Sequence, residues 1–97
     1  MSTGCGQAGT LESCDALVMV ILDAAASGLS IVLDGPSVNA FEEEMRHAVE
    51  ETLSSLKIVG ASVTVSERGA LDCTLRARVE TAARRALAAG EGIGDRL

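Results

Sequence analysis

The stretch Leu29-Ser-Ile-Val-Leu-Asp-Gly-Pro-Ser37 marks the point where one structural period gives way to another. Its first six residues alternate, with Leu29, Ile31 and Leu33 on one face of an expected strand. Gly35-Pro36 ends this strand, and Ser37 stands where the N-cap of a helix belongs. The apolar stripe of the helix that follows comprises Phe41, Met45, Ala48, Val49, Thr52 and Leu56. The stretch therefore predicts a strand followed directly by an amphipathic helix.

The segments on either side show the same two periods. Ala16–Leu22 is a short apolar run rich in β-branched residues, and residues 61–66 alternate, so both are predicted strands. From Ala70 a helical period returns, and Gly90 is placed as its C-terminal stop. The apolar stripe of this second helix comprises Leu71, Leu75, Val79, Ala82 and Ala86.

The predicted element order is thus β-β-α-β-α. We expect an α+β two-layer sandwich, in which a three-stranded sheet carries two amphipathic helices on one face. The first two strands should pair as an antiparallel hairpin, and the first helix should form the crossover between the second and third strands.

Length and composition indicate one folded domain. The chain has 97 residues, of which 47% are hydrophobic and 23% charged, as in ordinary globular domains. Residues 1–9 contain three glycines and show no period, and residues 90–97 are also irregular. We therefore expect a flexible leader over residues 1–9, a folded domain over residues 10–89 and a flexible tail over residues 90–97.

Charge and residue usage argue against several classes of function. The net charge is −6 and the only aromatic residue is Phe41, a balance that disfavours nucleic-acid binding. The seven-residue apolar run Ala16–Leu22 is too short to span a bilayer, so no membrane association is expected. Three cysteines without a C-x-x-C pair suit a reducing, cytoplasmic location and give no metal-ligand spacing.

The sequence shows no catalytic constellation. His47, the single histidine, falls on the charged face of the first helix, where a solvated side chain is expected. Glu42-Glu43-Glu44 is interpreted as a solvated helix face. Cys14 has anionic neighbours and Cys73 points outward without a base, so neither thiol is expected to be catalytic. The residues alone predict a binding, carrier or structural subunit.

Arginines of the second helix leave two interpretations open. Arg76, Arg78 and Arg85 flank its apolar stripe. Ordinary helix-face charge is one reading, and a grip on a carboxylate, a phosphate or an acidic partner surface is the other.

Three blocks of sequence resemble a known family. They are Gly9-Thr-Leu-Glu-Ser-Cys-Asp15, Ser37-Val38 with Phe41, and Gly69-Ala-Leu-Asp-Cys-Thr-Leu-Arg-Ala-Arg-Val-Glu80. In this order they resemble the citrate lyase acyl carrier protein, the gamma subunit of that complex, over most of the chain. The resemblance departs at Cys14, where the family commonly has glycine, serine or asparagine.

This resemblance implies a function for Ser13. It implies that Ser13 carries a covalent prosthetic group, 2'-(5''-phosphoribosyl)-3'-dephospho-CoA, through a phosphodiester. The terminal thiol of that group would hold acetyl and citryl thioesters while citrate is cleaved to oxaloacetate and acetate. Catalysis would belong to the citrate lyase alpha and beta subunits, and a transferase would attach the group. The chain itself would be a non-catalytic carrier.

The residues agree with a carrier role, and two alternatives stay open. Ser13 lies on an irregular stretch between a glycine-rich leader and a strand, where a transferase could reach its hydroxyl. The malonate decarboxylase acyl carrier subunit is a close alternative of the same class. An adaptor or small-molecule regulatory module is an alternative of a different class, because the apolar strand Ala16–Leu22 could contact a partner.

Overall fold

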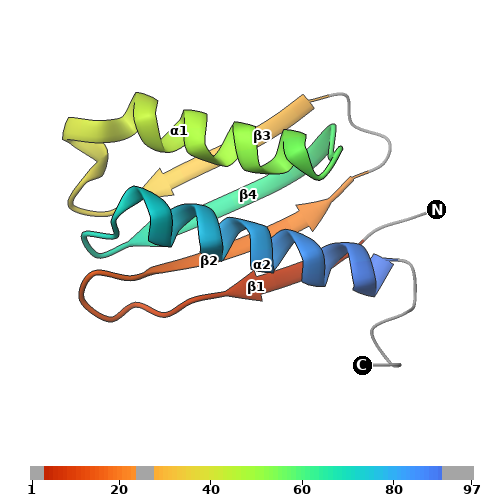
Figure 1. Cartoon of the computed structure of the whole chain (residues 1–97), viewed down its shortest axis with the longest axis horizontal. Coiled ribbons are helices and arrows are strands. Elements are labelled where there is room, and N and C mark those ends of the chain that lie inside the picture. Colours follow the sequence, from red (N-terminus) through yellow and green to blue (C-terminus); the bar gives the residue numbers. More distant parts are fainter. Residues whose placement is uncertain (1–3, 24–27, 91–97) are drawn as a thin grey trace.

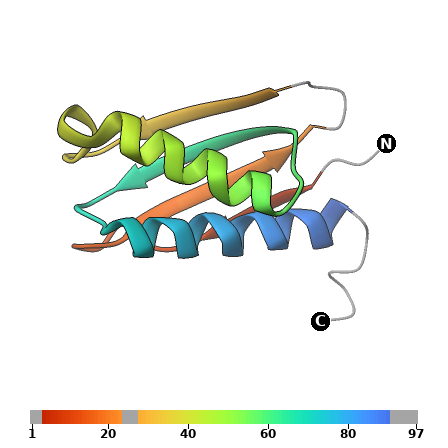
Figure 2. The same cartoon turned by 45° about the horizontal axis from the view of Figure 1, so that its top comes forward.

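A computed structural model describes residues 4–23 and 28–90 and confirms the α+β two-layer architecture. One layer is a sheet, and both helices lie across one of its faces (Figures 1 and 2). The elements in chain order are β1 (Cys5–Ala8), β2 (Ala16–Leu22), β3 (Gly28–Asp34), α1 (Val38–Ser55), β4 (Gly60–Glu67) and α2 (Asp72–Gly90). None of the described helices is long and apolar enough to cross a bilayer.

The sheet has four strands in the order β1-β2-β4-β3, one more than predicted. β3 and β4 are parallel neighbours joined through α1, which confirms the expected crossover. The expected hairpin is wrong, because β4 lies between β2 and β3 and pairs antiparallel with β2. β2 and β4 show the same alternating burial, and strands pair through backbone groups that every sequence carries, so local periodicity carries no information about which strands are neighbours.

The fourth strand comes from the segment that was expected to be a flexible leader. Cys5–Ala8 pairs antiparallel with β2, so the leader expectation is wrong for these residues. The glycines serve close packing here: a Cβ on Gly6 would overlap the carbonyl oxygen of Ala82 in α2. Residues 1–3 of the expected leader lie outside the described residues. In the expected tail, Gly90 is the last residue of α2 and residues 91–97 lie outside the described residues.

The core lies between the sheet and the middle turns of the two helices. α1 buries Met45, Ala48, Val49, Thr52 and Leu53, and α2 buries Leu75, Val79, Ala82, Ala83 and Ala86. These sets confirm most of both predicted stripes. Leu56 is an exception because it lies just beyond α1 and is only partly buried. Phe41 and Leu71 are the two exposed exceptions, with exposed fractions of 54% and 67%. Both lie where their helices begin.

Three connections gather at that same end of the molecule, on the left in Figure 1. Residues 9–15 join β1 to β2, residues 35–37 join β3 to α1, and residues 68–71 join β4 to α2. The candidate site is built from these three connections.

Candidate functional site

Ser13 lies at the tip of a tight turn between β1 and β2. The backbone N–H of Asp15 donates to the carbonyl oxygen of Glu12 at 3.1 Å, so Ser13 and Cys14 are the two central residues of the turn. Ser13 is exposed, and its hydroxyl forms no hydrogen bond within residues 4–23 and 28–90. A short, accessible primary hydroxyl is thus presented at the end of the sheet.

The turn is fastened to the beginning of the β4–α2 connection. The backbone N–H of Cys14 donates to the carbonyl oxygen of Arg68 at 2.7 Å, and the backbone N–H of Arg68 donates to the carbonyl oxygen of Asp15 at 2.9 Å. These bonds extend the antiparallel β2–β4 ladder, whose last pair is Ala16 with Glu67. The residue that follows Ser13 is therefore held directly by the sheet.

Asp15 organises the rest of this loop. One carboxylate oxygen accepts from Arg78 Nε at 2.8 Å and from the backbone N–H of Ala16 at 2.7 Å. The other accepts from the Thr10 hydroxyl at 2.8 Å. Hydrogen bonding to Arg78 and to these two groups holds the pKa of Asp15 well below its usual range. The carboxylate is charged at neutral pH and ties the loop to α2.

Two residues of the loop have backbone torsions in the left-handed region. Gly9 has φ 96°, and a Cβ there would also overlap the carbonyl oxygen of Ala16. Cys14 has φ 65° at the third position of the turn, where glycine or asparagine is favoured. This torsion favours glycine or asparagine over cysteine at this position.

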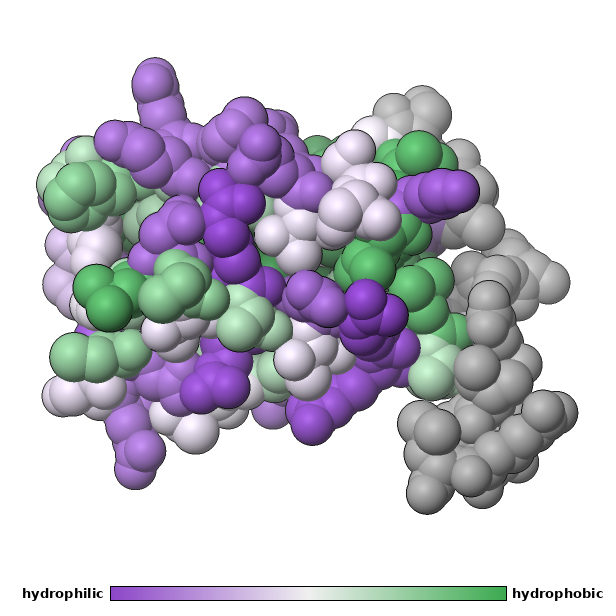
Figure 3. Space-filling view, in the orientation of Figure 1, coloured by the Kyte–Doolittle hydropathy of each residue, from purple (hydrophilic) through white to green (hydrophobic). Residues whose placement is uncertain are grey.

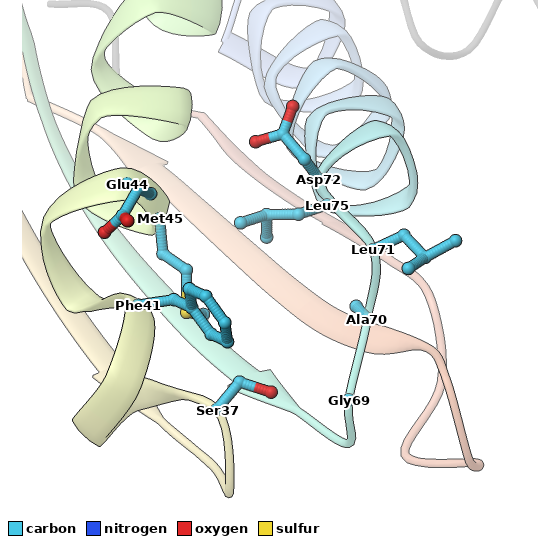
Figure 4. A pocket seen from close by; sticks show the side chains of 9 residues that line it. All are labelled: Ser37, Phe41, Glu44, Met45, Gly69, Ala70, Leu71, Asp72 and Leu75. Atoms are coloured by element: carbon cyan, nitrogen blue, oxygen red, sulfur yellow. The ribbon is translucent and has the colours of Figure 1, made fainter.

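A groove lies beside the turn, between the first turns of the two helices (Figure 4). Its volume is about 480 Å³. Its lining residues are Ser37, Phe41, Glu44, Met45, Gly69, Ala70, Leu71, Asp72 and Leu75. In Figure 3, apolar side chains interrupt the hydrophilic surface at this end of the helical layer.

Glu67 is buried beside the groove, and the sequence analysis did not identify it. The residue is only 1% exposed. One carboxylate oxygen accepts from the backbone N–H of Ser37 at 2.6 Å, and the other accepts from the backbone N–H of Gly69 at 2.7 Å. Burial raises the pKa of Glu67, but these hydrogen bonds outweigh burial and the net pKa lies below its usual value.

Glu67 thereby joins the connections that precede α1 and α2. Ser37 has no side-chain capping bond of its own, so the expected N-cap is present by position only, with Glu67 binding its backbone N–H. Gly35 leaves room for this carboxylate, because a Cβ there would overlap it. A sequence signal existed: Glu67 continues the inward alternation of Ala61, Val63 and Val65.

Of the other residues considered from the sequence, Glu42 and Glu43 are exposed on α1, and Glu44 is exposed and lines the groove. His47 pairs with Glu51 at 3.2 Å on the outer face of α1. Arg78 does grip a carboxylate, that of Asp15. Arg76 pairs with Asp72 and Glu51, and Arg85 donates to the carbonyl oxygen of Gln7 in β1 at 2.7 Å. The three cysteine thiols are free and exposed.

Comparison with known proteins finds acyl carrier proteins among the relatives of this chain. The citrate lyase acyl carrier protein of Lactiplantibacillus plantarum is 40% identical over 80 residues, which cover 82% of this chain and 81% of that protein. That of Treponema denticola is 38% identical over 78 residues, covering 80% and 86%. That of Klebsiella pneumoniae is 44% identical over 79 residues, covering 81% and 80%. A family model described as malonate decarboxylase delta subunit (MdcD) matches residues 4–86.

The domain is therefore an acyl carrier, built on a sheet with two helices. The chain belongs to the family of the citrate lyase acyl carrier proteins and the malonate decarboxylase delta subunit, as its sequence blocks indicated.

Proposed function

We propose that this chain is the acyl carrier subunit of a citrate lyase complex and that Ser13 Oγ is the attachment point of its prosthetic group. The group would be phosphoribosyl-dephospho-coenzyme A, linked by a phosphodiester. The observation that carries the proposal is the exposed Ser13 hydroxyl at the tip of a turn in which Cys14 and Asp15 are hydrogen-bonded to Arg68, and Asp15 also to Arg78 of α2.

The residues around Ser13 fit a bulky phosphodiester. The hydroxyl forms no hydrogen bond in the described part of the chain, so modification breaks none there. The turn projects from the end of the sheet, and a transferase could reach it without unfolding an element. Asp15 and Arg78 hold the backbone on the C-terminal side of the serine, which presents the hydroxyl in a defined position.

The bound group would supply a thiol that holds acetyl and citryl as thioesters. The chain's own contribution is to keep the attachment point rigid and to present it to successive partners at high effective concentration. The partners would be the alpha and beta subunits of the lyase, which would carry out acyl exchange and citrate cleavage in the cytoplasm. The names of the citrate lyase relatives favour a role in a citrate lyase complex.

Intact mass spectrometry tests the attachment. The chain is produced together with the maturation enzymes of its own organism, as wild type, Ser13→Ala and Ser54→Ala. We expect one added mass of the size of the nucleotide group on the wild type and on Ser54→Ala, because Ser54 is an exposed serine at the far end of α1. Ser13→Ala should show the bare chain mass. An added mass retained in Ser13→Ala would refute the assignment, and a bare wild-type chain would favour the adaptor alternative.

Reconstitution separates the two carrier assignments. The family model's description favours the malonate decarboxylase carrier as the second candidate. Loaded chain should support oxaloacetate formation from citrate when citrate lyase alpha and beta subunits are added. Support of malonate decarboxylation instead, with malonate decarboxylase partners, would assign the chain to that complex.

A further inference from the structure

The groove between α1 and α2 has the features of a binding site that the attachment point alone does not explain. Phe41 and Leu71 belong by periodicity to the apolar stripes, yet both are more than half exposed. Phe41 sits at a kink, with φ −130° and ψ 24° inside α1. The kink leaves the single aromatic side chain of the protein at the groove, and Met45 lies close behind its ring in Figure 4.

The groove and the Ser13 turn share one structural support. Cys14, the neighbour of Ser13, is bonded through its backbone N–H to Arg68, and Arg68 immediately precedes Gly69 in the groove lining. Glu67 fixes the other side of the same segment by binding the N–H of Gly69. A group tethered at Ser13 thus begins next to the wall of the groove.

The chemistry of the lining selects for an uncharged ligand. Phe41, Met45 and Leu75 contribute apolar surface from the two helices. The ionisable side chains in the lining are the carboxylates of Glu44 and Asp72. Asp72 pairs with Arg76 at 2.7 Å, so Glu44 supplies the uncompensated negative charge of the lining. Phosphates and a citryl group are anionic and would be repelled, whereas a neutral amide chain ending in a thiol or an acetyl thioester would be accepted.

We propose that this groove holds the uncharged thiol-bearing segment of the arm tethered to Ser13, with the phosphates left in solvent. The inference rests on the proposed attachment. A tethered ligand has an effective concentration of about millimolar, so weak binding is enough for the docked form to dominate. The bare thiol and the acetyl thioester would rest in the groove between partner visits, and the citryl thioester would stay outside.

Methionine methyl NMR tests this on the full chain. Met45 lines the groove, whereas Met19 is exposed and pairs with Thr64 on β4, so one labelled sample holds both a reporter and an internal control. Intact mass first establishes that Ser13 is loaded. On loading, the Met45 methyl resonance should shift and show NOEs to the arm, while Met19 should not move. Phe41→Ala should abolish the Met45 response, and Val59→Ala, an exposed apolar residue in the α1–β4 connection, should preserve it.

A chemical readout is independent of NMR. In a variant with all three exposed cysteines replaced by serine, the arm carries the only thiol. A thiol reacts in proportion to its undocked fraction, so iodoacetamide should alkylate the loaded Phe41→Ala protein roughly threefold faster than the loaded parent protein. Val59→Ala should match the parent.

The outcomes separate this inference from the proposed function. Loading of Ser13 without any change at Met45 and with equal alkylation rates would overturn the groove assignment and leave the attachment intact. A Met45 shift that appears only when the lyase alpha subunit is added would make the groove a partner interface and also overturn it. Failure of Ser13 to load would overturn both. A citryl arm that shifts Met45 as strongly as an acetyl arm would refute the selection against charge.

Discussion

The middle of the helical layer and the end that carries Ser13 follow opposite rules of burial. In the middle, Val49 of α1 and Val79 of α2 are fully buried, as apolar residues in a domain core usually are. At the end, Phe41 and Leu71 are exposed while the charged Glu67 is buried. The difference teaches that hydrophobicity decides burial in the middle, whereas at the end a carboxylate is buried because it binds the backbone N–H groups of Ser37 and Gly69.

The largest loss of stability should come from a substitution in the core. Leu53→Ala leaves a cavity under α1 and should lower the free energy of unfolding by about 3 kcal/mol. Phe41→Ala removes a larger side chain that is half in solvent, and should cost less than about 1 kcal/mol. Urea unfolding of both variants measures the two values. A cost for Phe41→Ala as large as that for Leu53→Ala would show that Phe41 belongs to the core.

A substitution at Glu67 tests the role of the buried carboxylate at the end that carries Ser13. Glu67→Gln replaces one of two carboxylate acceptors by an NH₂ group and leaves a backbone N–H of Ser37 or Gly69 without its partner. We expect a loss of about 2 kcal/mol in the free energy of unfolding. Glu43→Gln, on the exposed face of α1, should change stability by less than about 0.5 kcal/mol. Equal effects of the two substitutions would mean that the buried carboxylate does not join the helix starts.

Much of this structure could be predicted from sequence, and the limits have physical causes. The two-layer class, the strands over β2, β3 and β4 and both helices follow from periodicity, because one buried face imposes a period on each element. Strand order does not follow from periodicity, because β4 pairs with its two neighbours through backbone groups that every sequence carries. The strand Cys5–Ala8 was missed because its glycines serve close packing against α2 rather than flexibility.

The candidate site could also be predicted only in part. The exposure of Ser13 was expected from its irregular surroundings, and its hydroxyl is accessible in the structure. The groove was not expected, because a kink at Phe41 moves a residue off the stripe without changing its spacing in the sequence. The pairing of Arg78 with Asp15 spans 63 residues, a separation at which no local pattern operates.

Acid should remove the stability that the hydrogen-bonded carboxylates of Glu67 and Asp15 contribute. The pKa values of Glu67 and Asp15 are lowered in the folded chain, so the unfolded chain binds more protons in acid. The stabilisation is complete above their ordinary values, near 4, and is lost as pH falls through the lowered folded values. Urea midpoints should therefore fall between pH 5 and about pH 3. The decline should be shallower in Glu67→Gln and in Asp15→Asn, and a parallel decline in all three proteins would contradict the assignment.

The smallest expected effect concerns the turn itself. Cys14 adopts φ 65°, which costs an L-residue about 1 kcal/mol or more. Cys14→Gly removes this cost and adds chain entropy to the unfolded state, so a net gain of roughly 0.5 kcal/mol is expected. Cys73→Ala, in the exposed first turn of α2, is a control for loss of a thiol. Destabilisation by Cys14→Gly would show that the cysteine side chain has a contact that offsets its torsion.

The placement of the first strand has a practical consequence. β1 starts at Cys5 and α2 finishes at Gly90 on the side of the molecule opposite the Ser13 turn (Figure 1). A fluorophore or an immobilisation handle joined outside these two positions would orient every copy with its serine directed into bulk solution. The carrier is thus well suited to surface-based kinetics, in which enzymes flow past a layer of identically oriented acceptors.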